Sequence, residues 1–354
     1  MLRKGVSSSA PWWRSRSVQV MAAVVLALAL VAAGVALWRP ADSRAGGGTP
    51  LTADERRSLA TLRVIDAAHP LLEMTLYSPY DATRPVVAAP APGPPLACSL
   101  FLAARGPRGP VFGRNFDWIT SPALLLKTPS GRGPASLSLV DISYLGIDRL
   151  EADRVMREPA LQRKLLQAGS LPFDGMNEHG LVVGMAQIPD TRPARTPGLP
   201  TVGSVRIQRL VLDQARTVEE AIAVFGRYNV EFAPGEPSLH YLVADASGRS
   251  AVLEFVDGRL KVLRGGDSWH GMVNFVLSGA GDDVKRSDER YSAIVGRMRA
   301  TGGSLDPDGA MDLLAEVAQR NTRWSAVYEL HHGTVHVSLG RNYTRRHTFR
   351  LAGG

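Results

Sequence analysis

The sequence predicts an α+β fold in which strands and helices come in blocks. Strand-like segments follow residue 97, amphipathic helical segments extend to about residue 320, and strand-like segments return at the end. The regular alternation of strand and helix that is typical of a βαβ protein is missing. A hydrophobic content of 45% and a charged content of 21% are those of a globular chain. We therefore expect one folded body preceded by other segments.

Residues 1–45 predict an export signal or a membrane anchor, followed by a linker. Basic residues at 3, 4, 14 and 16 precede an unbroken apolar run over residues 20–38. A run of this length can also span a bilayer, which requires about 20 residues. Positive charge on the N-terminal side places the body outside the cytoplasm, either anchored to the membrane or secreted.

Residues 46–97 predict a pre-cysteine segment that acts as a propeptide. Thr52 can cap a helix that carries Leu59, Leu62 and Ile65 on one face. Residues 82–97 are rich in proline and alanine and cannot form a regular element. An extended, accessible stretch that ends directly before Cys98 is the kind of place where a chain is cut.

The body, residues 98–354, is expected to begin with a hairpin and to contain two pairs of helices. The strands are expected at 98–104 and 110–116, at 136–145, at 181–185, at 239–245 and 250–256, and over 324–350. The helices are expected at 204–215, from 217 onward, at 287–300 and at 306–320. Thr217 opens the second helix with a capping box, and Pro307 suits the first turn of the last one.

Cys98 is the single cysteine of the chain, and its surroundings predict a nucleophile. A lone cysteine in an exported protein favours a reactive thiol or a link between chains. The nearest histidines in the sequence are His69 and His179, so no neighbouring imidazole supplies a base. A cut before Cys98 would create an α-amine on the same residue, with an ordinary pKa of about 7.7–8.0 that suits a general base.

Arg114 and Asp117 lie where the predicted hairpin returns beside Cys98. A permanent cation there favours the thiolate, and a carboxylate can orient the α-amine. The spacing alone is equally compatible with an ordinary surface ion pair between Arg114 and Asp117, which would contribute little.

Other features of the body give no sign of a cofactor, a metal or nucleic acid. The histidines at 331, 332 and 336 lack the cysteines or carboxylates that would complete a zinc site. The apolar residues 124–126 are compatible with an acyl pocket or with the core. The net charge of +8 owes much to the segments before Cys98, and basic residues interleaved with aromatic ones are missing from the body. We therefore predict no cofactor, no metal and no nucleic-acid partner.

Several motifs spread over nearly the whole body carry a family resemblance. They are Cys98-Ser99-x-Phe101, Gly113-Arg114-Asn115-Phe116-Asp117-Trp118, Asp174-Gly175-Met176-Asn177-Glu178-x-Gly180-Leu181, residues 240–248, Asn274-Phe275, Ser287-x-x-Arg290-Tyr291 and residues 321–328. Together they resemble the N-terminal-nucleophile (Ntn) hydrolases that cleave linear amides, the choloylglycine hydrolase and penicillin V acylase family. The resemblance implies a four-layer αββα sandwich. It departs from many family members in the long stretch that precedes the cysteine.

The resemblance also implies roles for the first three site residues. Cys98 matches the nucleophile, and its α-amine matches the base. Arg114 matches the arginine beside the thiol, and Asp117 matches the aspartate that holds the amine.

Two asparagines and a late arginine complete the set that the resemblance implies. Asn177 matches an oxyanion donor through its backbone N–H, and Asn274 matches a second donor through its side-chain amide. Arg290 matches a late active-site arginine, for which Arg286 is a weaker candidate. Without the resemblance, Asn177 would be interpreted as a turn residue and Asn274 as the cap of a strand end.

The sequence thus predicts hydrolysis of a linear carbon–nitrogen amide through an acyl-thioester on Cys98. The substrate would be a small N-acyl compound with a bile acid, a penicillin V-type aryloxyacetyl, a fatty acyl or an acyl-homoserine lactone group. An acyltransferase would use the same residues, and a non-catalytic, membrane-tethered binding protein is the alternative from another class. A Cys–His protease is disfavoured because its usual sequence context does not surround Cys98. A membrane contact through the N-terminal segment and a homo-oligomer are the expected associations.

Overall fold

The structure is a computed structural model that describes residues 49–83, 97–118, 122–189, 191–232 and 236–351. The predicted signal or anchor in residues 1–45 lies outside these ranges, and so does the proline-rich stretch 84–96. Within the described ranges, no helix has both the length and the apolar character needed to cross a bilayer. Almost all of the described residues belong to one compact unit, Leu51–Gly354.

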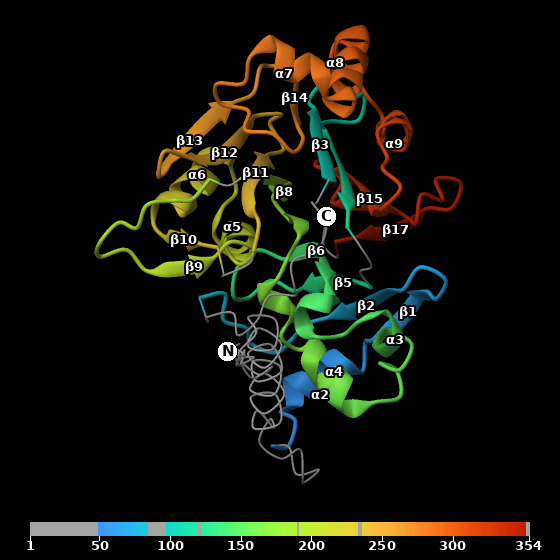
Figure 1. Cartoon of the computed structure of the whole chain (residues 1–354). Coiled ribbons are helices and arrows are strands. Elements are labelled where there is room, and N and C mark those ends of the chain that lie inside the picture. The colour runs from blue at the N-terminus through green and yellow to red at the C-terminus, as the bar shows by residue number, and fades with distance from the viewer. Residues whose placement is uncertain (1–48, 84–96, 119–121, 190, 233–235, 352–354) are drawn as a thin grey trace, which may run out of the picture. The chain divides into compact units, whose positions relative to one another are not determined.

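Two large β-sheets form the centre of the described part of this unit (Figure 1). In spatial order, the larger sheet has the strands β1 (Arg63–Asp66), β2 (Leu71–Thr75), β5 (Ala123–Thr128), β6 (Ser136–Asp141), β7 (Asp174–Asn177), β8 (Val182–Ile188), β11 (Ser238–Ala244), β12 (Ser250–Val256) and β13 (Arg259–Arg264). The smaller sheet has β14 (Trp269–Met272), β3 (Ala97–Ala103), β4 (Val111–Asp117), β15 (Thr322–Glu329), β16 (Thr334–Leu339) and β17 (His347–Arg350). Neighbouring strands in both are antiparallel, except that β2 and β5 are parallel. A short parallel pair, β9 (Thr201–Gly203) and β10 (Asn229–Glu231), stands apart from them.

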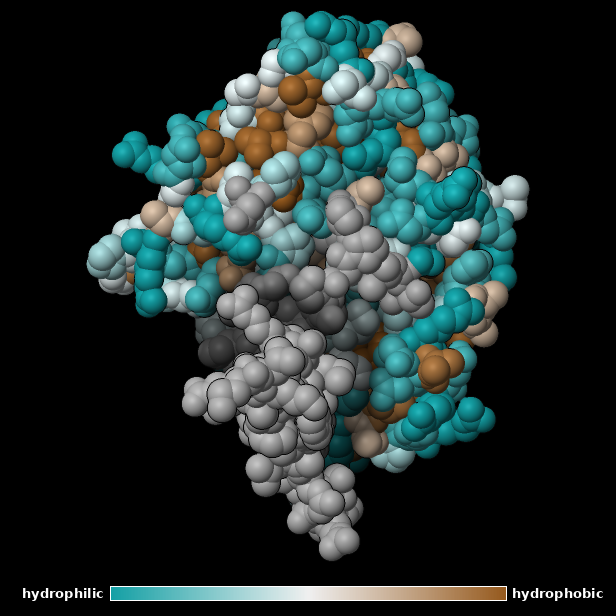
Figure 2. All heavy atoms as spheres, viewed as in Figure 1, coloured by the Kyte–Doolittle hydropathy of each residue, from teal (hydrophilic) through white to brown (hydrophobic). Residues whose placement is uncertain are grey.

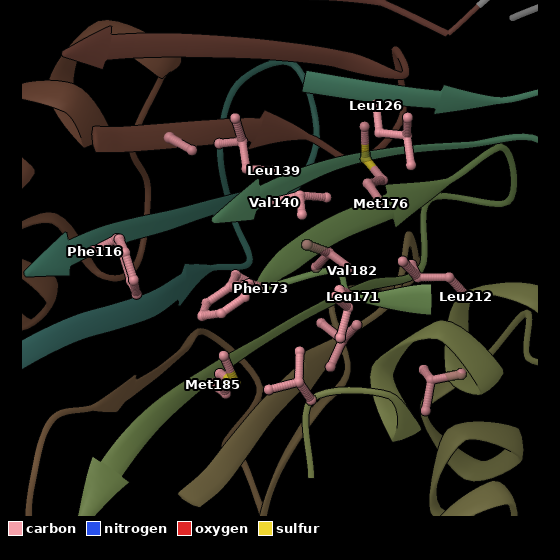
Figure 3. Packing of buried hydrophobic residues seen from close by; sticks show 14 of the residues in the cluster. Phe116, Leu126, Leu139, Val140, Leu171, Phe173, Met176, Val182, Met185 and Leu212 are labelled. Carbon is pink, nitrogen blue, oxygen red and sulfur yellow. The ribbon is translucent and has the colours of Figure 1, made fainter. Parts of the chain in front are cut away.

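The two large sheets pack face to face where β3 meets β8. The approach is close because residue 184 is a glycine: a Cβ there would come within 2.7 Å of Leu100 Cδ2. Figure 3 shows Phe116, Phe173 and Met185 within the same buried cluster. The main hydrophobic core therefore lies between the sheets.

Helices cover the outer face of each sheet. The helices are α2 (Ala53–Leu59), α3 (Arg149–Ala152), α4 (Pro159–Leu165), α5 (Ile207–Gln214), α6 (Val218–Gly226), α7 (Asp282–Ser287), α8 (Glu289–Thr301) and α9 (Pro307–Glu316). Short 3₁₀ turns occur at Ile142–Leu145 and Ala168–Ser170. In Figure 1, α5 and α6 lie against the larger sheet, whereas α8 and α9 lie against the smaller one. The layers therefore run helix, sheet, sheet, helix, which is the order that the resemblance implies.

The pre-cysteine segment is part of the same fold. Its helix α2 begins with the predicted capping box between Thr52 and Glu55. The helix ends at Leu59, so the prediction that Leu62 and Ile65 continue its apolar face is wrong. Ile65 instead lies in β1, which pairs with β2, and β2 in turn pairs with β5 of the body. Consecutive β-branched residues suit a strand better than a helix, and sheet pairing decides the outcome.

Other elements largely follow the predicted pattern, with differences at their ends. The hairpin of β3 and β4 is confirmed, whereas only the first part of the expected strand 136–145 is extended before a 3₁₀ turn begins. The strands β2, β5, β7, β9, β10, β13 and β14 and the helices α3, α4 and α7 were not anticipated. The apolar residues 124–126 lie fully buried in β5, so they belong to the core.

The outer edge of the larger sheet is an exposed strand with a mixed surface. On the face shown in Figure 2, hydrophobic residues gather over β12 to β14 in the upper left of the view. Leu260, Val262 and Leu263 of β13 are only half-buried. The flanking Arg259 and Lys261 are exposed, and such charges discourage edge-to-edge pairing with another chain.

We predict that the pre-cysteine segment contributes to the stability of the whole unit. Replacing Met74 of β2, which is fully buried, by alanine should lower the free energy of unfolding by about 2–5 kcal/mol. The measurement is urea unfolding of full-length protein that carries Cys98→Ala, so that the chain stays uncut. Val64→Ala is the matched control, because Val64 is 46% exposed in the neighbouring strand. Equal losses for the two variants would contradict the prediction.

Candidate active site

Strand β3 places Cys98 on the face of the smaller sheet that meets the larger one. Its cross-strand partner in β4 is Phe116, and Leu100 is paired with Arg114. Alternate residues of a strand share a face, and so do cross-strand partners. Cys98 and Arg114 therefore lie on the same face, and Arg114 Nη2 is 4.0 Å from Cys98 Sγ.

The guanidinium group of Arg114 is fixed by acceptors from the opposite sheet. Its Nη1 is 2.9 Å from Asp174 Oδ2, and its Nη2 donates to the carbonyl oxygen of Met185 at 3.1 Å. Trp324 Nε1 donates to Asp174 Oδ2 at 3.1 Å, and the hydroxyl of Tyr328 donates to Asp174 Oδ1. Both members of the ion pair are fully buried. A buried pair of this kind needs further hydrogen bonds. Asp174 has them from Trp324 and Tyr328, whereas Arg114 Nε has no hydrogen-bond partner among the described residues.

Asp117 ends β4 and lies opposite Ala97, the residue before Cys98. Its Oδ1 accepts a hydrogen bond from Thr322 Oγ1 at 2.5 Å, while its Oδ2 is buried without a hydrogen-bond partner among the described residues. Burial raises the pKa of Asp117 to about 7, although the Thr322 hydrogen bond and the charges of Arg290 and Arg114 lower it. The carboxyl group is thus close to half-protonated at neutral pH.

The alternative of a surface ion pair between Arg114 and Asp117 is wrong. Both side chains are buried, and the carboxylate that pairs with Arg114 is Asp174.

Asn274 and Arg290 hold the backbone of Cys98. The N–H of Cys98 donates to Asn274 Oδ1 at 2.6 Å, and Arg290 Nη1 donates to the same oxygen and to the Cys98 carbonyl oxygen, each at 2.8 Å. Asn274 Nδ2 donates to the Gln187 carbonyl oxygen at 2.8 Å. Two donors on one side and an acceptor on the other fix which way the amide points. Arg290 is itself paired with Asp288 at 3.0 Å.

A buried His–Glu pair supports the loop that carries Asn274. His240 Nδ1 is 3.0 Å from Glu254 Oε1, and His240 Nε2 is 2.7 Å from the carbonyl oxygen of Val273. Glu254 also accepts the backbone N–H groups of Leu277 and Ser278. Burial acts to raise the pKa of Glu254, but these hydrogen bonds outweigh it and the pKa is lowered. The ionised carboxylate therefore ties both ends of the loop to β11 and β12.

The thiol of Cys98 is enclosed, with 1% of the residue exposed. Burial raises its pKa to about 11, the charge of Arg114 lowers it, and the charge of Asp117 raises it. In this structure Ala97 precedes it in β3, so Cys98 carries a peptide N–H and not an α-amine. Without a base, the thiol stays protonated at neutral pH.

Asn177 makes its contacts elsewhere. Its backbone N–H donates to the carbonyl oxygen of Leu181 at 2.9 Å, so the group expected to bind an oxyanion is already occupied. Its side-chain Nδ2 donates to the carbonyl oxygens of Leu212 and Ala215 at the end of α5. Asn177 therefore fixes a turn against a helix, as its residue type suggests without the resemblance.

The structure thus brings five of the six predicted site residues together and leaves Asn177 outside. Those five are Cys98, Arg114, Asp117, Asn274 and Arg290. Arg286 is also outside, because its side chain is 73% exposed and its described carboxylate neighbour is Asp282 at 4.0 Å.

Sequence reasoning missed several residues that complete the site. Asp174 opens one of the quoted motifs, and an acidic residue in a buried strand is the signal that could have identified it. Thr322 lies within the quoted stretch 321–328, but its role and that of Gln187 are not visible in the sequence, since each contributes one hydrogen bond that depends on tertiary packing.

Two of the three histidines considered for a metal, His331 and His336, have other partners. His336 lies between Glu329 at 2.9 Å and Thr348 at 3.0 Å. Over the described ranges, no group of three or more His, Cys, Asp or Glu side chains is arranged to hold a metal ion.

Comparison with known proteins points to acylases and amide hydrolases. The family model described as acyl-coenzyme A:6-aminopenicillanic acid acyl-transferase matches residues 168–274, a stretch that contains Asp174 and Asn274. A penicillin V acylase from Pectobacterium atrosepticum is 27% identical over 201 residues, which are 51% of this chain and 49% of the relative. The chain therefore matches about half the length of that relative.

Among solved structures, one of those similar to this chain shows the same fold. A mutant of the conjugated bile acid hydrolase from Clostridium perfringens superposes with a TM-score of 0.52 and 14% identity, over 73% of this chain and 93% of that one. The penicillin V acylase from Agrobacterium tumefaciens has a TM-score of 0.47 and 19% identity, over 68% and 83% of the two chains. The first similarity confirms the mixed, sheet-rich α/β fold.

We predict that Asp117 makes the uncut protein less stable as the pH rises. Its pKa is about 7 when folded and 3.8 ordinarily, so the folded state holds the proton more tightly. The free energy of unfolding should then fall as the pH rises between these two values. Urea unfolding of Cys98→Ala protein across this interval should show the fall, and adding Asp117→Asn should reduce it. The amide keeps an oxygen for Thr322 but has no charge to bury. Parallel curves for the two proteins would rule this out.

Proposed function

We propose that the chain is an N-terminal-nucleophile hydrolase related to the penicillin V acylases and bile acid hydrolases to which it is similar, and that it cleaves a small N-acyl amide through Cys98. The observation that carries this proposal is the placement of Arg114. Its guanidinium group is locked by Asp174 and directs Nη2 to Cys98 Sγ. A fixed cation beside a buried thiol stabilises the thiolate that attack requires.

The first step of the proposed function is a cut between Ala97 and Cys98. Cys98 Sγ attacks the Ala97 carbonyl carbon, and the peptide C–N bond breaks while the departing nitrogen takes up a proton. The product is a thioester between Ala97 and Cys98 with a free α-amine on Cys98. Water then hydrolyses the thioester to give a carboxylate on Ala97 and a thiol on Cys98. The buried Oδ2 of Asp117, which lies opposite Ala97, is the described carboxyl oxygen suited to relay a proton here.

After the cut, the α-amine serves as the base for turnover. It occupies the position of the peptide nitrogen that now donates to Asn274 Oδ1 at 2.6 Å. With an ordinary pKa of about 7.7–8.0, the amine can take the thiol proton near neutral pH. Sγ bonds to the substrate carbonyl carbon, the leaving amine receives the proton, and water releases the acyl group from the thioester.

Asn274 is the proposed donor to the oxyanion that forms during attack. A side-chain amide has two N–H groups, and the Gln187 carbonyl oxygen accepts one of them. The other N–H is assigned to the substrate oxygen. Arg290 holds the amide oxygen of Asn274 and so orients that N–H.

The pre-cysteine segment is proposed to stay bound after the cut. Strand β2 is paired with β5, and Leu71, Leu72 and Met74 are buried in the common core. Tyr80 Oη also donates to Asp213 Oδ1 at 2.9 Å. The mature enzyme would then consist of two chains held together by a shared sheet. We also propose, from residues 1–45, that this enzyme acts outside the cytoplasm.

Transfer of the acyl group to an amine is the second candidate function. It is favoured by the matched family model, whose description is that of an acyl-transferase. The same thioester would then react with an amine in place of water. Turnover with an N-acyl amide in the presence of a second amine distinguishes the two: a new amide product indicates transfer, and free acid alone indicates hydrolysis.

The cut is tested by intact-mass analysis and N-terminal sequencing of purified protein. We expect a body chain that begins at Cys98 and co-purifies with the preceding segment, while Cys98→Ala protein remains a single chain. Ser99→Ala is the matched control, because Ser99 is the next residue of the strand and points to the opposite face. A wild-type protein that stays uncut and still cleaves amides would refute the amine-base mechanism.

The oxyanion role of Asn274 predicts a loss in kcat. Asn274→Ala should lower kcat by about 10²–10³, and Asn274→Asp should lower it as well, because Asp keeps the acceptor for Arg290 but has no N–H. Both are measured on protein shown by mass to be cut. Asn177→Ala is the control, and it should lower the free energy of unfolding while kcat of the folded fraction is kept. Retained kcat in Asn274→Asp would show that Asn274 acts only as an acceptor.

A further inference from the structure

A cavity of about 220 Å³ at one end of the sheets is lined by four arginines. We call it the arginine pocket, defined by Arg149, Arg320, Arg323 and Arg341 together with Thr322 and Trp324. Among the described residues, no aspartate or glutamate lines it. Arg320, Thr322, Arg323 and Trp324 come from the start of β15 and the residues before it, whereas Arg341 follows β16 and Arg149 begins α3.

The four guanidinium groups are not neutralised by carboxylates in the described part of the chain. Arg323 Nε donates to the Trp118 carbonyl oxygen at 2.7 Å, and Arg149 Nη2 is 3.5 Å from the carbonyl oxygen of Ala68. Many other arginines of the protein have a carboxylate within 4 Å, as Arg154, Arg264 and Arg297 do. Four cations around one cavity without such a partner form an attractive site for an anion.

Asp66, three residues before His69 of the pocket wall, is already engaged. Asp66 accepts the backbone N–H of His69, which lies at the pocket, but its carboxylate pairs with Arg345 at 3.3 Å and His347 at 3.4 Å. Burial and the charge of Arg149 lower the pKa of Arg323, which is the effect expected of cations that crowd without compensation.

The turn after β16 keeps Arg341 at the pocket in an unusual backbone conformation. Gly340 has a φ of +55° and Arg341 a φ of +65°. Gly340 lies so close to His69 that a Cβ would come within 2.2 Å of the imidazole ring. A left-handed residue other than glycine is uncommon, and such strain tends to occur at ligand sites.

The pocket lies at the same end of the sheet as the thiol. Cys98 is paired with Phe116, and Phe116 is paired with Trp324 of the pocket wall. Two strand spacings separate Cys98 from Trp324, which corresponds to about 10 Å. Thr322, another wall residue, donates to Asp117 of the candidate active site. The pocket wall and the candidate active site are therefore adjacent.

We infer that the arginine pocket binds the oxyanion group of a small molecule, such as a carboxylate, sulfonate or phosphate. The anion has two possible sources: a charged group of the amide substrate, or a separate small anion. Only the first source rests on the proposed amidase function. Because His69 and Pro70 also line the cavity, the pocket is complete only while the pre-cysteine segment remains on the body.

The binding test uses inorganic phosphate and the full-length Cys98→Ala protein, so it does not depend on catalysis. Calorimetric titration at constant ionic strength should show saturable binding at a defined site. The double variant Arg320→Gln with Arg341→Gln should weaken it at least tenfold, and the corresponding double Lys variant should retain part of it. Arg320 and Arg341, which are replaced by Gln in one protein and by Lys in the other, are both exposed. Circular dichroism checks that each protein is folded.

The matched control removes the same number of charges elsewhere. Arg259→Gln with Lys261→Gln changes two exposed residues of β13, at the far edge of the larger sheet. This protein should bind phosphate as the parent does. The inference is overturned if the parent shows no saturable binding, or if the control loses as much affinity as the pocket variant.

A pair of amide substrates that differ by one carboxylate identifies the source of the anion. If the cut wild-type enzyme prefers the carboxylate form in kcat/KM and the Gln double variant loses this preference, the substrate supplies the anion. If phosphate binds the parent but the two substrates react alike, the pocket binds a separate anion. Both outcomes support the site, and a protein that binds phosphate but cleaves no amide would refute only the proposed amidase function.

Discussion

The buried ion pair between Arg114 and Asp174 is the interaction on which the rest of the site depends. Arg114 belongs to the smaller sheet and Asp174 to the larger one, so the pair joins the two layers at the thiol. Removing one partner of such a pair leaves an uncompensated charge in the core and costs about 3–5 kcal/mol. Trp324 and Tyr328 donate hydrogen bonds to the two oxygens of Asp174, and these bonds offset part of the cost of burying its carboxylate. The placement of Arg114 beside the Cys98 thiol and the packing of the two sheets thus have a common cause.

The same arrangement explains why the chain before Cys98 cannot be treated as a disposable leader. Strand β2 adds to the sheet that contains Asp174, and its apolar side chains belong to the core that encloses Cys98. Removing it would expose both the edge of β5 and a large apolar surface. The arginine pocket depends on this segment as well, because the turn before β2 forms part of its wall.

The sequence predicted local features well where a short stretch of residues decides the structure. The hairpin around Cys98 and the cap at Thr52 depend on neighbours within a few residues, and both were found. From the hairpin register it also follows that Arg114 shares a face with Cys98. The region of Ile65 was misjudged, because an apolar spacing that suits a helix was overridden by pairing with β2.

Features that depend on distant parts of the chain could not be obtained in this way. Asp174 meets Arg114 only when the two sheets pack, and Thr322 meets Asp117 only when β15 joins β4. The four arginines of the pocket come from three separate segments, so no single motif indicates the pocket. For Asn177, a motif was present but did not indicate the contacts. The residue lies in a family-like motif, yet its hydrogen bonds are made within its own turn and with α5.

Burial explains why the Cys98 thiol is protonated in the uncut site and what a cut would change. It raises the pKa of the Cys98 thiol to about 11 and that of Asp117 to about 7, so at neutral pH the thiol is protonated and the carboxyl group is close to half-protonated. A cut at Ala97 would place an ammonium beside this carboxyl, and a nearby cation lowers the pKa of an acid. Asp117 would then ionise and hold the new amine, which needs only to lose its proton to act as a base. Before the cut, an ionised Asp117 carboxylate is buried at a cost in free energy. After the cut, the same carboxylate would be attracted to the ammonium group of Cys98, and this difference favours the cut form.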